Sequence, residues 1–319
     1  MPRADSWPPF ETFSRRDLLR NAALTAAALA LPSPLAACRG RMAGEPREPA
    51  GPDHERLTAW TAALRAERSA LQEAPFGRSA IRVGELAIGT PYEPFTLETY
   101  LRTGGSPTHE PLTTSLTRFD CVTLVEACLA VARLAGQEGS PTWEGFGREI
   151  ERIRYRGGER HGYASRLHYF SEWITDGARR GLLRDLGSEL GGMEDARRLR
   201  FMTEHRPSYP ALASDAVFRD IGAMERRLDQ HPRRVIPTKR IPEVVDRLET
   251  GDVLAFATEI SGLDVSHAAF AYRDGDGILR VLHAPLSGGV VEVTRTTLPE
   301  YVAAIRRSTG ILVARPMKG

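Results

Sequence analysis

The stretch of sequence that decides the fold is GDVLAFATEISGLDVSHAAFAYRDGDGILRVLHA, residues 251–284. Its apolar runs are short, contain β-branched and aromatic residues, and are separated by turn residues, as is typical of antiparallel strands. Within it, Asp274-Gly275-Asp276-Gly277 predicts a hairpin turn. The strands expected here and further along the chain are 253–256, 268–272, 278–282, 290–293 and 311–314.

Helices are expected before this sheet. The strongly apolar segment from Cys121 to about Leu134 predicts a buried helix, with Asp120 as its N-cap. Helical periodicity also predicts amphipathic helices over 54–71, 81–88, 143–153 and 171–183, and a last helix over 298–306. Helices first and an antiparallel sheet afterwards predict an α+β fold. The middle region, about 141–240, shows no further pattern that assigns its elements.

Composition excludes some classes of protein. The chain has 319 residues, of which 41% are hydrophobic and 26% are charged, with a formal net charge of +2. These values are ordinary for a globular protein, so the chain as a whole is not disordered. A protein that binds nucleic acid mainly through phosphate contacts is also disfavoured.

The N-terminus resembles an export signal. Ser14-Arg15-Arg16 resembles the twin-arginine motif, an apolar stretch follows over 21–37, and Leu35-Ala36-Ala37-Cys38 resembles a lipobox. We therefore expect a signal peptide over 1–37, a lipidated Cys38, a flexible tether over 38–55 and a single domain over 56–319. Acylation would place the protein on a membrane surface in the periplasm. The residue after the lipidated cysteine is Arg39, and the resemblance to Gram-negative lipoproteins then implies the outer membrane rather than the inner one.

Two other cysteines lie in the apolar helix. Cys121 and Cys128 are seven residues apart, which is about 10 Å along a helix and too far for a disulfide. Cys128 is expected to be a core residue. Cys121 would take the first helical position, where the helix dipole and the free amides favour a thiolate. A nucleophilic role for Cys121 is the alternative to a buried, inert thiol.

Two histidines are candidates for the base that such a nucleophile needs. His267 begins one predicted strand and His283 ends the next. A hairpin centred on Gly275, with a loop of three or five residues, would place them side by side on one face, whereas a four-residue loop would separate them. The three residues could in principle bind zinc, but the spacing typical of zinc sites is missing, so no metal or cofactor is expected.

The motifs around these residues resemble those of the NlpC-type papain-like peptidoglycan hydrolases. The closer likeness is to the N-acetylmuramoyl-L-alanine amidase-like subfamily, and it spans roughly residues 75–316. The motifs are Gly89-Thr90-Pro91-Tyr92, Phe119-Asp120-Cys121-Val122-Thr123-Leu124-Val125-Glu126, Gly251-Asp252-Val253-Leu254, Ser266-His267-Ala268-Ala269, Leu282-His283-Ala284, the segment from Arg166 to Trp173 and the segment from Tyr301 to Arg315.

The resemblance implies a papain-like fold in which the helix of the nucleophile packs against the antiparallel sheet. It implies Cys121 as nucleophile, His267 as general base and His283 as the residue that orients His267. Tyr92 would line the cleft. Arg166 and Tyr169 are candidates to bind a stem-peptide carboxylate, since guanidinium groups pair with carboxylates.

The expected function is therefore hydrolysis of an amide bond in the peptide part of peptidoglycan. The bond between N-acetylmuramic acid and L-alanine is the first candidate, and the bond between γ-D-glutamate and the diamino acid is the alternative. A non-catalytic, membrane-tethered peptidoglycan-binding protein is the rival from another class. The expected partners are the stem peptide and, through Cys38, a membrane.

Overall fold

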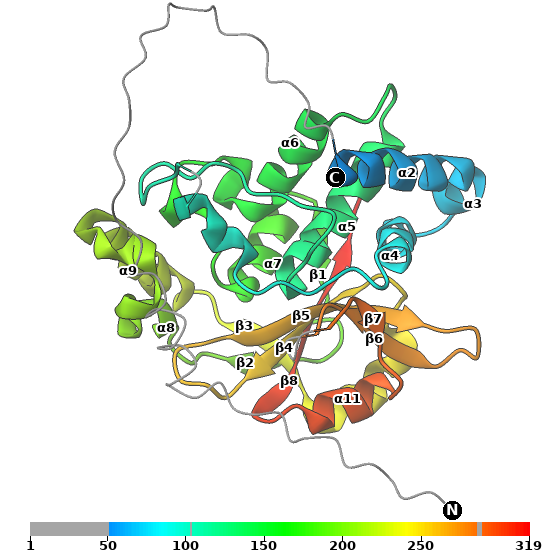
Figure 1. Ribbon diagram of the computed structural model, residues 1–319. Helices are drawn as coiled ribbons and strands as arrows, with labels where there is room; N and C mark the ends of the chain where they lie inside the picture. The colour runs from blue at the N-terminus through cyan, green and yellow to red at the C-terminus, as the bar shows by residue number, and fades with distance from the viewer. Residues whose placement is uncertain (1–50, 103, 286–288) are drawn as a thin grey trace, which may run out of the picture.

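The computed structural model describes residues 51–102, 104–285 and 289–319 (Figure 1). The expected signal peptide over 1–37, the lipidation of Cys38 and most of the tether lie outside the described residues. Among the described residues, no helix is long and apolar enough to cross a membrane.

An antiparallel sheet of eight strands forms one layer of the molecule. Its strand order is β2-β3-β8-β4-β5-β6-β7, with β1 paired to β8. The consecutive strands β4 to β7 form the meander expected from sequence, but β8 lies between β3 and β4, in the middle of the sheet. The bounds are β1 Leu183–Asp185, β2 Met193–Asp195, β3 Arg233–Pro237, β4 Val253–Thr258, β5 Val265–Arg273, β6 Leu279–His283, β7 Glu292–Val293 and β8 Ser308–Pro316.

Helices cover both faces of the sheet, most of them on one side and α11 on the other (Figure 1). This arrangement confirms the expected α+β class. The α-helices are α2 Pro52–Ala66, α3 Arg68–Glu73, α4 Phe76–Leu86, α5 Cys121–Gly136, α6 Trp143–Arg154, α7 Phe170–Arg179, α8 Phe201–Glu204, α9 Asp215–Leu228, α10 Ile241–Val244 and α11 Leu298–Ala304. The helix expected over 54–71 is divided into α2 and α3.

Helix α5 is the centre of the larger core. Every residue from Thr123 to Ala135 is buried. The helix contacts α2, α4, α6 and β5. On this face of β5 the core contains Ala268 and Phe270. On the opposite face, Ala269 and Ala271 join a second core with residues of α10 and α11. The helix that begins at Cys121 is therefore packed against the strand that carries His267.

The middle region contributes α6 to α9, the strands β1 to β3, and a third apolar cluster built mainly around Tyr163, Tyr169 and helix α9. Strands β1 and β2 have only three residues each, and most of those residues are exposed or half-buried. Such short strands carry no readable alternation, which explains why the sequence did not reveal them.

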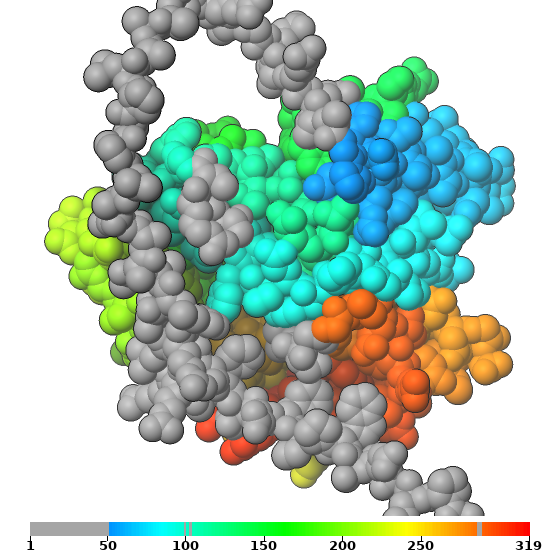
Figure 2. Space-filling model, viewed as in Figure 1, coloured from blue at the N-terminus to red at the C-terminus, as the bar shows by residue number. Residues whose placement is uncertain are grey.

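A segment before α5 closes one edge of the sheet. The amide of Gly89 donates to the carbonyl of Val291 at 2.9 Å, and the amide of Tyr92 donates to that of Gly289 at 2.9 Å. Figure 2 shows the surface of this contact, where the cyan segment lies directly on the orange one. The segment places Tyr92 close to the start of α5, because Tyr92 also forms a β-bridge with Phe119.

The Gly251-Asp252 motif is explained by packing. Asp252 is buried and accepts two hydrogen bonds from the Arg315 guanidinium, both at 2.8 Å, which ties the start of β4 to β8. Gly251 has a φ of +95°, and a Cβ added there would lie 2.1 Å from the carbonyl oxygen of Gly77. This close approach lets α4 contact the turn before β4.

Replacement of Gly251 with alanine is expected to lower the free energy of unfolding by about 3 kcal/mol or more, because it adds both a clash and a strained backbone. Urea denaturation measures the change. The matched control is Gly275→Ala, where an added Cβ has nothing within 4 Å. Equal losses of stability in the two variants would contradict this explanation.

Candidate active site

Cys121 is the first residue of α5, directly after an N-cap that the sequence predicts. The Asp120 carboxylate accepts hydrogen bonds from the amides of Val122 at 3.1 Å and Thr123 at 2.8 Å. The Thr123 hydroxyl accepts from the Asp120 amide at 2.9 Å, which completes a capping box. The Thr96 hydroxyl donates to the other Asp120 oxygen at 2.6 Å. Both oxygens of Asp120 are thus committed to holding the start of the helix.

The two histidines lie on one face of adjacent strands, as expected, but not directly opposite each other. In the β5–β6 pair, Phe270 is opposite Leu282 and Arg273 is opposite Leu279. The loop between them has five residues, which is one of the lengths predicted, and its centre is Asp276 rather than Gly275. His267 and His283 are therefore diagonal neighbours on the same face.

A β-bulge lies immediately before His267. In the β4–β5 pair, Phe256 is opposite His267 while Ala257 is opposite Val265, so Ser266 is the extra residue. Bulges bend a strand and change the direction of nearby side chains, and they are frequent next to active sites. The ring of His267 stacks on that of Phe256, with centroids 5.5 Å apart and an interplanar angle of 17°.

The two imidazoles are hydrogen-bonded to each other. His267 Nε2 lies 2.8 Å from His283 Nδ1, and both side chains are buried. If His267 donates this bond, its Nδ1 carries the lone pair. That Nδ1 is buried and has no hydrogen-bond partner among the described residues. The pair thus fixes one ring and leaves a basic nitrogen available.

Tyr301 belongs to the same cluster, although the sequence did not point to it as a site residue. Its hydroxyl lies 3.3 Å from His283 Nδ1, and the two rings meet edge to face at 5.2 Å. On the other side, Glu292 is 3.8 Å from His283 Nε2. Tyr301 is in α11, and only the packing of that helix under the sheet brings it here. The family resemblance covers the segment that begins at Tyr301, but no local pattern in it signals a contact with His283.

The environment of the sulfur differs from the expectation at a helix start. Burial, and after it the nearby Asp120 carboxylate, raise the pKa of the Cys121 thiol, which is about 12 in the folded protein. The backbone amides of Ala268, Cys121 and Val122 act in the opposite direction. The expected stabilisation by helix amides is present, but burial exceeds it, so the resting thiol is protonated.

The same interactions locate the sulfur. Its neighbour in β5 is the Ala268 amide, adjacent in sequence to His267. Burial is the main cause that raises the pKa values of Tyr92 and Tyr301, and Cys121 in its deprotonated form adds to both. The structure therefore brings Cys121, Tyr92 and the His267–His283–Tyr301 cluster together. The sulfur does not form a hydrogen bond with His267 Nδ1 in this structure.

Both imidazoles are held neutral. Burial lowers the pKa of His283 to about 4. Burial, and after it the neighbouring His283, holds the pKa of His267 well below its usual range. His168, outside the cluster, is also shifted downward by burial and by Arg166, while a hydrogen bond to the Tyr163 carbonyl opposes the shift.

These histidines predict how stability depends on pH. The unfolded chain binds protons at them below about pH 6.5, whereas the folded chain does not until a lower pH. The free energy of unfolding should therefore be highest above pH 6.5 and fall as the pH drops towards 4, by roughly 3 kcal/mol for His283 alone. Urea denaturation at several pH values measures the slope.

In that experiment the slope of the free energy of unfolding against pH should be smaller in His283→Gln than in wild type. The difference should correspond to about one bound proton, whatever the stability of the variant at neutral pH. The control is His231→Gln, since His231 is exposed. A slope that is the same in wild type and in the His283 variant would mean that His283 is not held neutral by the fold.

Arg166 and Tyr169, the expected carboxylate-binding residues, are not brought to this cluster. The buried Arg166 guanidinium pairs with Glu98 at 2.9 Å and with Glu110 at 2.8 Å. The Tyr169 hydroxyl donates to Glu225 at 2.7 Å. The polar end of Arg166 is already bonded to carboxylates of the segment before α5, and that of Tyr169 to a carboxylate of α9. We therefore assign both residues to internal packing and do not carry the substrate-binding role forward.

Cys128 is buried in the α5 core, as the sequence predicts. It and Cys121 are both free thiols, which agrees with their spacing along the helix. Cys128 has no part in the cluster and offers a matched control for Cys121.

Comparisons with known proteins place this fold and site in a class. The family model described as AmiA-like, N-acetylmuramoyl-L-alanine amidase-like, matches residues 82–311, which is well over half of the chain and includes the whole cluster. The chain belongs to this family. No curated protein matches it.

Solved structures agree with the family. An N-acetylmuramoyl-L-alanine amidase from Bacteroides uniformis is 28% identical with a TM-score of 0.69, over 76% of this chain and 99% of that one. A Bacteroides fragilis protein provisionally named a xylanase is 33% identical with a TM-score of 0.66, over 73% of this chain and 99% of that one. The Legionella pneumophila protein LPG0564, 17% identical with a TM-score of 0.56 over 83% of this chain and 97% of that one, shares the fold.

Proposed function

We propose that this protein is a cysteine amidase that cuts an amide bond in the peptide part of peptidoglycan. Cys121 is the nucleophile, His267 the general base and His283 the residue that orients it. The observation that carries the proposal is the hydrogen bond between His267 Nε2 and His283 Nδ1. It leaves His267 Nδ1 buried and without a partner among the described residues, and the amide of the next residue, Ala268, contacts the sulfur.

The chemistry follows from two neutral partners. As the sulfur attacks the carbonyl carbon, the thiol proton passes to His267 Nδ1, and that proton then goes to the leaving amine nitrogen. A thioester on Cys121 results. Water next attacks the thioester, His267 takes its proton, and the acid product leaves with the thiol restored. The missing hydrogen bond between sulfur and Nδ1 would form with substrate bound, since such bonds are often long in free enzymes.

The start of α5 supplies the groups that would stabilise the tetrahedral oxyanion. The Cys121 amide lies beside the sulfur, at the positive end of a sixteen-residue helix. Tyr92 lines the same region, with its ring partly buried and its pKa raised first by that burial and then by Cys121 and Asp120 nearby. We assign Tyr92 to contact with the substrate or with this oxyanion.

The bond between N-acetylmuramic acid and L-alanine is the proposed site of cleavage, because both the family description and the Bacteroides uniformis relative carry that activity in their names. Mass spectrometry of muropeptides digested by the purified protein tests it. Stem peptides that begin with L-alanine support the amidase. Peptides that begin with the diamino acid, together with L-Ala-D-Glu still joined to N-acetylmuramic acid, would instead show cleavage between γ-D-glutamate and the diamino acid.

The xylanase name of the Bacteroides fragilis relative does not fit this cluster. Most glycosidases need two carboxyl groups on either side of the scissile bond. Here both oxygens of Asp120 are bonded in the helix cap. Glu292, with 55% of its side chain exposed, lies on the side of His283 away from His267. Xylan included in the same digestion should yield no reducing sugar.

We further propose that the chain is exported as a twin-arginine lipoprotein and is anchored to a periplasmic membrane surface through Cys38. The support is the order of motifs in residues 14–38. The mass of the mature protein should show acyl chains on Cys38, and Cys38→Ala should release the protein from the membrane. A membrane-bound Cys38 variant would overturn the anchor.

A further inference from the structure

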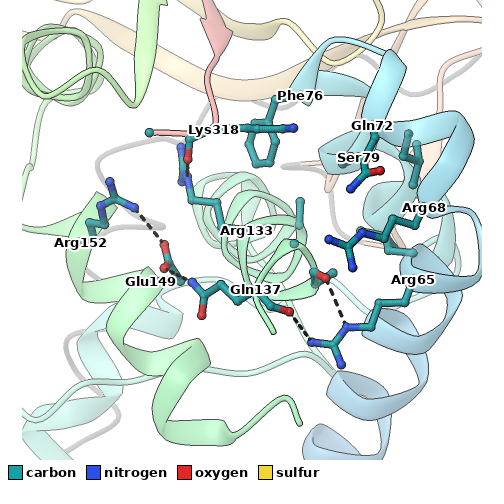
Figure 3. A pocket seen from close by; sticks show the side chains of 16 residues that line it. Arg65, Arg68, Gln72, Phe76, Ser79, Arg133, Gln137, Glu149, Arg152 and Lys318 are labelled. Atoms are coloured by element: carbon teal, nitrogen blue, oxygen red, sulfur yellow. Dashed lines mark hydrogen bonds and ion pairs between the residues drawn. The ribbon is translucent and has the colours of Figure 1, made fainter. Parts of the chain in front are cut away.

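A basic pocket lies at the far end of α5 from Cys121 (Figure 3). It has a volume of about 270 Å³ and is bounded by α2, α3, the start of α4, α5, α6 and the C-terminal segment. The α5 residues that line it begin at Ala132, eleven positions after Cys121, which corresponds to roughly 17 Å along the helix. The pocket is therefore separate from the candidate active site.

Positive charge dominates its lining. One acidic side chain, Glu149, lines the pocket, and the cationic side chains that do so are Arg65, Arg68, Arg133, Arg152 and Lys318. Figure 3 shows Arg65 and Arg68 on one side, Arg152 and Glu149 on the other, and Arg133 between them. Positive charge is therefore in clear excess among the lining side chains.

Contacts within the protein do not neutralise the charge of these side chains. Arg65 donates to the carbonyls of Ala135 and Gln137 at the end of α5, at 3.2 and 3.0 Å. Carbonyl oxygens accept hydrogen bonds without neutralising the charge. Arg152 lies 3.6 Å from Glu149, a long ion pair. Arg68 is exposed and has no ion pair or hydrogen bond within the described ranges.

Arg133 is the informative residue. It is only 6% exposed, and its Nε and Nη2 donate to the carbonyls of Lys318, Leu182 and Met317. Its Nη1 is buried with no partner in the described part of the chain. A buried charged donor without a partner is costly, so such a group usually has one in the functional state. An anionic oxygen in the pocket would supply it.

Part of the uncharged lining is apolar. Leu64, Leu71 and Phe76 face the same space, and the Arg133 guanidinium lies over the Phe76 ring at 5.3 Å from its centroid. A simple inorganic anion would leave these side chains without a contact. The pocket is suited to a ligand that has an anionic group joined to a short apolar one.

We propose that this pocket binds a phosphate monoester with a short apolar group. A phosphate monoester carries up to two negative charges and three acceptor oxygens, which suits several converging guanidinium groups better than a single carboxylate does. The phosphoryl oxygens contact Arg133 Nη1, Arg68 and Arg152, and the apolar group lies against Phe76. This site is independent of the proposed amidase activity.

Calorimetric titration of the full chain with n-butyl phosphate, inorganic phosphate and butyrate, at low salt, tests the site. Butyl phosphate should bind more tightly than either of the others. Arg68→Gln and Arg152→Gln should each weaken its binding at least tenfold, and Arg133→Met should abolish it in protein that remains folded. The control is Arg148→Gln on α6, whose guanidinium pairs with Glu144 on the exposed face.

A second experiment, with vesicles of phosphatidic acid or phosphatidylcholine, distinguishes a lipid headgroup from a soluble phosphate ester. Binding to phosphatidic acid that is lost in Arg68→Gln identifies a lipid headgroup. Binding of butyl phosphate without such vesicle binding identifies a soluble phosphate ester. Butyrate bound as tightly as butyl phosphate, or binding unchanged by both Arg68→Gln and Arg152→Gln, would overturn the proposal. Muropeptide hydrolysis should be unchanged in these variants.

Discussion

Replacement of Cys121 with alanine is expected to reduce the hydrolysis of muropeptides by about 10⁴-fold or more. The sulfur is the atom that attacks the carbonyl, and nothing else in the described cluster can form the thioester. The rate of product release, followed by chromatography of purified muropeptides, measures the effect. The fold should persist, because Cys121 lies at the edge of the core and its N-cap interactions come from Asp120 and Thr123.

The control for this variant is Cys128→Ala. Cys128 lies on the same helix and is also a free thiol, but it is 1% exposed within the core. Its removal should cost stability through a small cavity and leave the rate per folded molecule near that of wild type. If Cys121→Ala hydrolysed muropeptides as fast as wild type, the protein would be a binding protein or would use another nucleophile.

Replacement of His267 with alanine should reduce hydrolysis by about 10³- to 10⁴-fold, since the protonated thiol then has no base. The raised pKa of Cys121 gives a second measurement. Alkylation of Cys121 by iodoacetamide near pH 7 should become much slower in this variant. As the pH approaches 12, hydroxide removes the proton directly and the two alkylation rates should converge.

The pH profile of the wild type distinguishes the base from a merely structural histidine. His267 accepts the thiol proton only while it is neutral, and its pKa lies well below 6.5. The acid limb of kcat/KM should therefore lie well below pH 6.5. An acid limb at or above the pKa of a free imidazole would contradict the neutral pair that the structure shows.

Much of the fold could be predicted because it depends on local patterns. The apolar run after Asp120 predicts α5, and the short apolar runs between turn residues after residue 250 predict β4 to β7. The position of β8 in the middle of the sheet depends on pairing over long sequence distances, which no local pattern records. The sequence pattern does not assign most elements of the middle region, because its strands are short and its helices carry many charged residues.

The residues of the candidate site also fall into those that local sequence signals mark and those that only tertiary packing brings together. Cys121, His267 and His283 are detectable because a helix cap and two strand ends mark them, and the odd hairpin loop correctly placed both histidines on one face. Tyr301 was missed because only tertiary packing brings it to His283. Arg166 was assigned to the substrate because an arginine in a motif suggests a ligand, whereas burial beside Glu98 and Glu110 explains it.

The most direct test of the central claim is to trap the thioester. Wild-type protein mixed with muropeptide and quenched in acid within milliseconds should carry an added mass on the peptide that contains Cys121, and Cys121→Ala should carry none. For the amidase the adduct contains N-acetylmuramic acid, and for the endopeptidase it contains L-Ala-D-Glu. Rapid hydrolysis with no adduct at any quench time, or an adduct on another residue, would contradict the claim that Cys121 is the nucleophile.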